Sequence, residues 1–332
     1  MKKLVCLVLA LVVLMAMATC ASAEWKFERK IDIVCPWGVG GGADGTIRPM
    51  ANLLSEILGV PVEVVNVEGA GGVNGVEYTY KQPADGYTFM LGTQSLFIQD
   101  MMDTTTMNFK DDFEVVDVLV HSVNVFCGSK KWLDDHGVSN WSELETYIEA
   151  HPYEVPIALL SAGGVDGAGT YQATEARGLY LMETPYTSGS DANSALVGGH
   201  CALYLCGADE VAGLIESGDI VPLLVLMENR MNILPDVPCT GELGIDSYMA
   251  PWRAIFAVSG TPQEAIDAMV AAVEEARSSE TWQNFITTAG YDERPVPEVG
   301  EALDTFVQSE WKGLRDYMVE LDTLAKDYDD LK

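Results

Sequence analysis

A glycine cluster near the start of the chain has the composition of an anion-binding loop. Within the stretch CPWGVGGGADGT (35–46), five of the eight residues at 38–45 are glycine, and the stretch lies between an apolar run and a helical pattern. Glycine leaves backbone N–H groups unobstructed, and the amino end of a helix adds partial positive charge, so a carboxylate or phosphate can approach closely. A side chain at Gly40–Gly42 should hinder that approach and strain a positive φ angle.

Two further segments repeat the same device. EGAGGVNG (68–75) follows a second apolar run, and SAGGVDGAG (161–169) follows another in the middle of the chain. Tight-turn geometry could explain any one of these loops. Three of them converge on one cleft if the strands before them point their carboxyl ends at it, and this predicts capture of a small anionic ligand.

Other chemistries have weaker support in the sequence. Residues 38–43 fit the pattern G-x-G-x-x-A of nicotinamide-binding folds, but neither Glu63 nor Glu68 ends the second strand at the usual offset. His121 and His200 have no obvious serine and carboxylate partners, and the chain lacks G-x-S-x-G, H-E-x-x-H, Walker A and EF-hand motifs. We therefore expect no catalytic residues and no cofactor.

The cysteines indicate buried thiols rather than a framework or a metal site. Two of the seven lie in the first 23 residues, and the others are Cys35, Cys127, Cys201, Cys206 and Cys239, with no C-x-x-C pair. Along a strand, Cys201 and Cys206 point to opposite faces, so HCALYLC (200–206) is a poor metal motif. We expect free thiols and no bound metal.

The elements that must position the glycine loops follow a β-α-β rhythm. IDIVCPW (31–37) precedes a helical face at 47–58, and the rhythm restarts with VPIALLSAGG (155–164), a helical stretch to about Leu181 and two more apolar runs. This pattern predicts two α/β lobes with mostly parallel sheets covered by helices. The apolar stretch 252–260 is expected to form a strand that returns to the first lobe, so that two crossings make a hinge.

Several helix boundaries can be predicted from capping patterns. Asp44 or Thr46 can cap the first helix, which places Pro49 in or near its first turn. TPQE (261–264) has the pattern of a capping box that opens another helix, and an amphipathic pattern predicts a last helix over about 299–324.

The first 23 residues have the features of a signal peptide. Two lysines precede an apolar run that ends in Ala-Ser-Ala, and Cys20 offers a second route through a lipid anchor. Cleavage leaves 17 basic and 50 acidic residues, because the two lysines are lost from 19, and the formal charge becomes −33. This acidity excludes nucleic acid and anionic membrane surfaces as expected partners.

Six short motifs in register resemble the substrate-binding proteins of tripartite tricarboxylate transporters, the Bug-type receptors. The motifs are PWGVGGGAD (36–44), GAGGVNG (69–75), PADGYT (83–88), TPYTSGSDANSALVGG (184–199), RMNILPDVPCTGELG (230–244) and SEW (309–311). The resemblance implies the type II periplasmic-binding-protein fold, two hinged α/β lobes that close over a small carboxylate. The expected parts are a signal peptide at 1–23, lobe 1 at 24–124, lobe 2 at 125–248, and a return to lobe 1 with C-terminal helices at 249–332.

The resemblance also implies which residues bind the ligand and which partners the protein has. Carboxylates are held in this family largely by backbone amides, hydroxyls and water. The matching positions are Trp37, Gly38, Val39, Gly40, Gly41, Gly42, Asp44, Gly71, Gly72, Asn74, Thr93, Gln94, Ser95, Ser161, Gly163, Gly164, Asp166, Tyr186, Thr187, Ser188 and Asp209. The implied protein is an extracytoplasmic monomer that delivers its ligand to membrane permease subunits.

Some departures from the family pattern leave alternatives open. Asp166, Asp191 and Asp209 could meet a ligand amine, or they could be ordinary turn and helix-cap residues. Arg48 adjoins the first glycine loop, but at its place in the helix we expect it to point away from the cleft. Two other functions use the same cleft: a receptor that signals to a membrane sensor kinase, and an exported enzyme.

Overall fold

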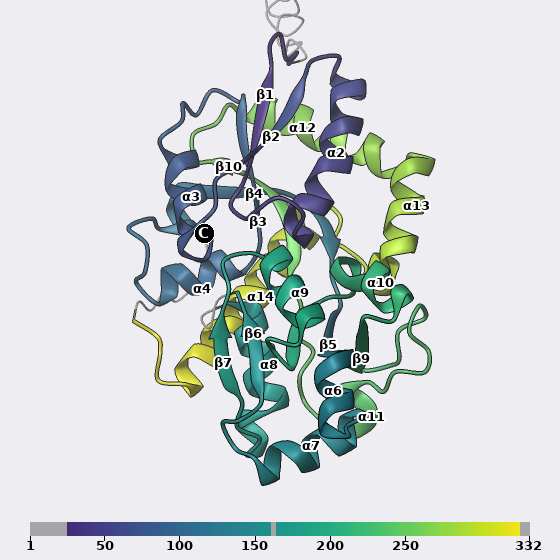
Figure 1. The fold of residues 1–332 in the computed structure, drawn as a ribbon. Helices are drawn as coiled ribbons and strands as arrows, with labels where there is room; N and C mark the ends of the chain where they lie inside the picture. Colours follow the sequence, from purple (N-terminus) through teal and green to yellow (C-terminus); the bar gives the residue numbers. More distant parts are fainter. Residues whose placement is uncertain (1–24, 161–163, 326–332) are drawn as a thin grey trace, which may run out of the picture.

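Two five-stranded sheets form the described part of the chain, residues 25–160 and 164–325 of a computed structural model (Figure 1). The first sheet has the order β2-β1-β3-β10-β4, and the second has the order β7-β6-β8-β5-β9. Their strands are β1 (Ile31–Cys35), β2 (Val62–Asn66), β3 (Thr88–Gly92), β4 (Phe113–His121), β5 (Asn124–Ser129), β6 (Pro156–Leu159), β7 (Met182–Pro185), β8 (Leu203–Gly207), β9 (Ile220–Val225) and β10 (Trp252–Val258).

Each sheet contains one strand that runs against its neighbours. β10 pairs antiparallel with β3 and β4, and β5 pairs antiparallel with β8 and β9, whereas β1, β2 and β3 are parallel, as are β6, β7 and β8. The chain therefore crosses between lobes twice, after β4 and again between β9 and β10. The predicted return of the strand at 252–260 to the first lobe is confirmed, as is the two-lobe α/β fold.

Helices cover both faces of each sheet, as the alternating pattern predicts. They are α2 (Gly42–Leu58), α3 (Val73–Tyr80), α4 (Ser95–Met101), α5 (Phe109–Asp112), α6 (Lys130–His136), α7 (Trp141–Ala150), α8 (Val165–Ala173), α9 (Gly189–Gly198), α10 (Ala208–Ser217), α11 (Thr240–Leu243), α12 (Gln263–Arg277), α13 (Glu280–Ala289) and α14 (Glu301–Glu320). Three single 3-10 turns are η1 (Ala70–Gly72), η2 (Glu175–Arg177) and η3 (Tyr291–Glu293). None of the helices in the described residues is long and apolar enough to span a bilayer.

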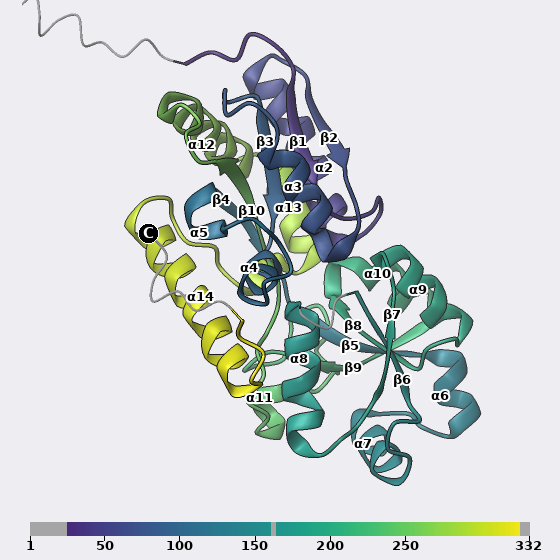
Figure 2. The ribbon, with the colours of Figure 1, turned by 90° about the vertical axis from the view of Figure 1, so that its left-hand side faces the viewer.

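The last helix, α14, runs beside both lobes (Figure 2). Its Trp311 and Leu314 share a buried cluster with Phe97 of α4 in lobe 1 and with Ala168 of α8 in lobe 2. The ring of Tyr317 also lies 6.0 Å from that of Tyr171 on α8. The C-terminal segment thus packs against lobe 2 as well as lobe 1.

Three predicted helix boundaries are wrong. α2 begins at Gly42 with Gly41 as its N-cap and no capping side chain. Of the two predicted caps, Asp44 accepts from the Gly40 N–H outside the helix, and Thr46 Oγ1 donates to the Gly42 carbonyl (2.8 Å). Pro49 is consequently the eighth helical residue rather than a first-turn residue.

The predicted capping box at 261–264 does not form either. Pro262 is the N-cap of α12 without a side-chain hydrogen bond, and Thr261 Oγ1 donates to the carbonyl of Val258 (2.8 Å). The helix predicted to reach about Leu181 ends at Ala173, where Thr174 leaves the helical region. All five cysteines of the described residues are buried and free. The expected signal peptide and Cys20 lie outside the described residues.

Candidate ligand-binding site

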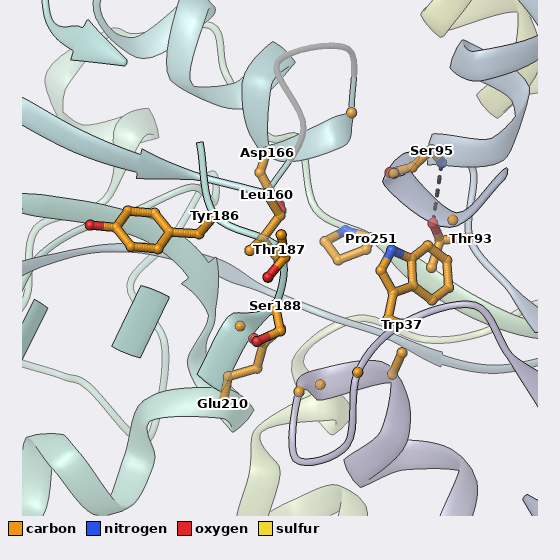
Figure 3. Close-up of a pocket in the computed structure, with 18 of the residues that line it drawn as sticks. Trp37, Thr93, Ser95, Leu160, Asp166, Tyr186, Thr187, Ser188, Glu210 and Pro251 are labelled. Atoms are coloured by element: carbon orange, nitrogen blue, oxygen red, sulfur yellow. Dashed lines mark hydrogen bonds between the residues drawn. The ribbon is translucent and has the colours of Figure 1, made fainter. Parts of the chain in front are cut away.

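A cavity of about 230 Å³ lies between the two lobes (Figure 3). Lobe 1 and its returning segment contribute Trp37, Gly38, Gly41, Gly42, Ala43, Gly69, Ala70, Gly71, Gly72, Thr93, Ser95, Pro251 and Arg253. Lobe 2 contributes Leu160, Gly164, Asp166, Tyr186, Thr187, Ser188, Gly189 and Glu210. All three glycine-rich loops identified in the sequence reach this cavity.

The first glycine loop brings the amino end of α2 to the cavity. Gly40 has φ of +83°, whereas Gly41 is extended with φ of −81°, so the positive φ expected through Gly40–Gly42 occurs only at Gly40. A Cβ on Gly189 would lie 3.7 Å from the Gly41 Cα, which means that the two lobes meet here, backbone against backbone. A Cβ on Gly41 would meet its nearest neighbour, the Gly38 carbonyl oxygen, at 3.7 Å, which is an ordinary van der Waals distance.

Asp44 supports this loop instead of facing the cavity. Its carboxylate accepts hydrogen bonds from the Gly40 N–H (3.0 Å), from Arg48 Nε (2.8 Å) and from Asn66 Nδ2 (2.9 Å). Burial opposes its ionisation, but the hydrogen bond from Arg48 and those from Gly40 and Asn66 lower the pKa of Asp44. Arg48 also donates to Asn66 Oδ1 (2.7 Å) and does not line the cavity, so the structure places it away from the cleft.

The second glycine loop has four consecutive residues with positive φ. The angles are +119° at Gly69, +50° at Ala70, +64° at Gly71 and +103° at Gly72. Left-handed backbone favours glycine, which explains the composition of this loop. The Asn74 side chain turns outward, where its Nδ2 donates to the Glu68 carbonyl (3.1 Å), and it does not line the cavity.

Residues 93–95, at the junction of β3 and α4, contact lobe 2. The Ser95 N–H donates to Thr93 Oγ1 (3.2 Å), and Ser95 Oγ accepts from the Val165 N–H of lobe 2 (3.3 Å). Gln94 is buried between them and bonds with the Ala250 carbonyl (2.8 Å) and the Trp252 N–H (3.0 Å). Gln94 therefore fixes the start of β10 rather than contacting the cavity.

On lobe 2, the start of α9 is held by its own side chains. Ser188 is the N-cap, and its Oγ accepts from the Asp191 N–H (3.2 Å) and donates to Asp191 Oδ2 (2.8 Å). Thr187 Oγ1 donates to the same carboxylate (3.0 Å). Asp191 is thus a helix-cap residue, the ordinary one of the two roles considered from the sequence.

Asp166 lies in the first turn of α8 and lines the cavity. Its Oδ1 accepts from Asn124 Nδ2 (3.1 Å), across the start of β5. Burial raises the pKa of Asp166 to about 6, against the effects of Asn124 and of Arg253. This carboxyl group therefore belongs to the cavity, as the resemblance implies.

An ionic cluster that the sequence analysis missed joins the lobes at the cavity floor. Arg253 of β10 donates from Nη1 to Asp209 Oδ2 (3.1 Å) and from Nη2 to Glu210 Oε1 (3.1 Å), both at the start of α10 in lobe 2. Arg253 is only 2% exposed, and it also donates to Thr46 Oγ1 (3.2 Å) and the Tyr291 hydroxyl (2.5 Å). The feature of the sequence that could have indicated this cluster is the lone arginine in the apolar run WRAIFAV.

Glu210 rather than Asp209 lines the cavity. Asp209 is held away from it by Arg253 and by Ser122 Oγ, which donates at 3.0 Å. Burial, and then the neighbouring Asp209, raise the pKa of Glu210 to about 8 in spite of Arg253 and the Gly42 N–H, which favour the charged form. One guanidinium shared by two carboxyl groups cannot fully compensate both.

The raised pKa of Glu210 predicts a dependence of stability on pH. A carboxyl group whose folded pKa is above its ordinary value of 4.5 stabilises the fold at low pH, and this contribution is lost as pH rises through about 8. Glu210→Gln cannot ionise. We therefore expect its free energy of unfolding, relative to that of the wild type, to rise by on the order of 1–3 kcal/mol when the pH increases from 5 to 8.5. Urea unfolding at both pH values measures it, with the exposed Glu216→Gln of the same helix as control. An unchanged difference would contradict the raised pKa.

The cavity lining contains most of the expected site residues. Those present are Trp37, Gly38, Gly41, Gly42, Gly71, Gly72, Thr93, Ser95, Gly164, Asp166, Tyr186, Thr187 and Ser188. Those that do not line it are Val39, Gly40, Asp44, Asn74, Gln94 and Asp209, because Val39 points to solvent (64% exposed) and the others serve loop or lobe contacts. Ser161 and Gly163 lie outside the described residues. Lining residues missed by the sequence analysis are Leu160, Glu210, Pro251 and Arg253.

Comparison with known families identifies the group to which this two-lobe fold belongs. The family described as tripartite tricarboxylate transporter family receptor matches residues 46–316. The chain belongs to this family. Protein BugT of Bordetella pertussis (strain Tohama I) is 30% identical over 262 residues, which cover 78% of this chain and 79% of BugT. The resemblance of the six motifs is thereby confirmed.

Solved structures support the fold of this receptor family. MatC from Rhodopseudomonas palustris with bound malate has a TM-score of 0.79 at 22% identity, covering 87% of this chain and 99% of MatC. The R. palustris protein Rpa4515 with adipate has a TM-score of 0.79 at 24% identity, covering 90% of this chain and 96% of its own. At these identities the likeness shows the fold.

Proposed function

We propose that this receptor captures a small carboxylate outside the cytoplasm by closing its lobes, and that it hands the ligand unchanged to the permease subunits of a tripartite-type transporter. The observation that carries the proposal is the cavity, which is lined from both lobes by glycine-rich loops. Unobstructed amides and a helix amino end favour a carboxylate. Malate and adipate in the two R. palustris structures are ligands of this chemical kind.

The acidity of the chain affects the encounter with such a ligand more than the bound state. A net charge of −31 for the full chain repels a carboxylate at long range, but salt screens charges over about 8–10 Å at moderate ionic strength. Affinity then depends on the local amides and hydroxyls of the cavity. We propose a monomeric receptor, with no nucleic acid or cofactor as a partner.

The proposal predicts that a ligand closes the protein. Native mass spectrometry of freshly purified protein identifies a co-purified carboxylate, which is then removed and added back. We expect the ligand to decrease the radius of gyration in solution scattering, because closure favours contacts between the lobes such as that of Ser95 with Val165. At 100 times Kd it should stabilise the fold by about 2.7 kcal/mol.

A carboxylate that calorimetry shows not to bind serves as the control in the same buffer. Binding without a smaller radius would mean a rigid, pre-closed pocket and would contradict the clamp. Chemical conversion of the bound compound would show an exported enzyme instead of a transport receptor.

A further inference from the structure

The cavity has an excess of acidic side chains. Among the described residues, the charged side chains that line it are Asp166, Glu210 and Arg253. The single cation is committed to the protein itself, because its guanidinium donates to Asp209 and Glu210 as well as to Thr46 and Tyr291. Two carboxyl groups, Asp209 and Glu210, therefore share the one arginine, and the third, Asp166, forms no ion pair with it.

The two lining carboxyl groups occupy different positions on lobe 2. Glu210 lies at the amino end of α2, where it accepts a hydrogen bond from the Gly42 N–H and forms an ion pair with Arg253. Asp166 lies on α8, where its Oδ1 accepts a hydrogen bond from Asn124 Nδ2 (3.1 Å), and no basic residue of the described part of the chain lies within ion-pair distance of it. A ligand carboxylate must consequently use the remaining amides of the glycine loops, next to an unneutralised acid.

Burial of another negative charge beside Asp166 would be unfavourable unless a positive charge accompanies it. An ammonium group supplies that charge and can donate up to three hydrogen bonds to carboxyl oxygens. Burial raises the pKa of Asp166 to about 6 and that of Glu210 to about 8, in spite of Arg253, which agrees with a cavity whose one cation is already paired.

We propose that the cavity selects a carboxylate that also carries a protonated amine, with Asp166 as the residue that determines this specificity. This inference rests on the proposed function, since it names the ligand class of the same cleft. The ligand carboxylate binds to the glycine amides, and its ammonium group faces Asp166 on lobe 2.

Calorimetric titration with matched acid pairs tests the inference. The probes are succinate against aspartate and glutarate against glutamate, together with the acid identified by native mass spectrometry and its analogue with or without the amine. We expect the aminated member of a binding pair to bind at least ten-fold tighter at pH 7.5. Equal or tighter binding of the acid without the amine overturns the inference but leaves the carboxylate receptor intact. Failure of every carboxylate to bind overturns the proposed function, and the inference with it.

Two variants assign the effect to the residue. Asp166→Asn should weaken the aminated acid by at least ten-fold and leave its amine-free analogue unchanged or tighter, because the negative charge alone is removed. Glu216→Gln removes one charge from an exposed position on α10 and should change neither. Circular dichroism verifies folding, and if Asp166→Asn does not fold, the amine preference of the wild type decides. Equal weakening of both acids by Asp166→Asn would show a general packing role and overturn the assignment.

Discussion

Arg253→Met is expected to lower the free energy of unfolding by about 3–5 kcal/mol at pH 7. The substitution keeps much of the side-chain volume but leaves Asp209, which is 9% exposed, without its counter-charge. It also leaves Glu210, which is 11% exposed and whose pKa of about 8 keeps it largely protonated at pH 7, without its hydrogen-bond donor. Removing one partner of a buried ion pair is costly because the other charge stays out of water. It also removes the donors to Thr46 and Tyr291.

The compensating variant tests the cause. Arg253→Met combined with Asp209→Asn and Glu210→Gln removes the unpaired charges and should recover at least half of the lost stability. Urea unfolding followed by circular dichroism measures both variants, with Arg230→Met, which breaks an ion pair whose partners are 43% and 41% exposed, as the matched control. Wild-type stability of the Arg253→Met variant would show that the cluster contributes nothing to holding the lobes together.

Most of the architecture could be predicted because its signals are local. The apolar run at 252–260 has the length and composition of a strand, and only its position after the second lobe indicated that it returns to the first. The antiparallel insertion of β10 between β3 and β4 could not be predicted, since pairing partners about 130 and 160 residues earlier in the chain leave no local pattern. The capping errors have a local origin: the hydroxyls of Thr46 and Thr261 donate to backbone carbonyls four and three residues earlier, instead of accepting from the first amides of a helix.

The candidate site was predictable where backbone chemistry defines it. Gly41, Gly72 and Gly164 line the cavity, and they could be predicted because a glycine at a strand-to-helix turn is visible in the local sequence. Arg253 and Glu210 were missed because their significance arises from a contact between lobes, at a separation of 43 residues. A lone charged residue in an apolar strand, such as Arg253, must find a buried partner, and that requirement was visible in the sequence.

The acidic side chains show the limit of motif transfer. Asp44 and Asp209 match the family pattern but serve the protein's own arginines, Arg48 and Arg253. Asp166 has no arginine partner in the described residues, and this difference is the basis for our proposal that it faces the ligand. Whether an arginine is available to pair with the carboxylate, rather than the motif, distinguishes Asp44 and Asp209 from Asp166.

The second large effect is expected at Gly42, where closure and ligand binding depend on the absence of a side chain. A Cβ at this position would lie 2.1 Å from Arg253 Nη2 and 2.4 Å from Glu210 Oε1, which is too close for either buried group to remain in place. At Gly45, three residues further along the same helix, a Cβ would meet nothing within 4 Å. The two glycines therefore form a matched pair that differs only in what they face.

Gly42→Ala should weaken ligand binding by about ten-fold to a hundred-fold, because a hydrogen bond to a charged group is worth roughly 1.5–3 kcal/mol and the displaced Arg253–Glu210 pair no longer joins the lobes. Gly45→Ala should leave affinity unchanged and raise stability by about 0.5–1 kcal/mol, since alanine favours a helix interior. Calorimetric titration with the ligand identified by native mass spectrometry, alongside urea unfolding, measures both. Equal affinities in the two variants would mean that neither the amino end of α2 nor the ionic cluster takes part in binding, and the glycines of this loop would then serve its turn alone.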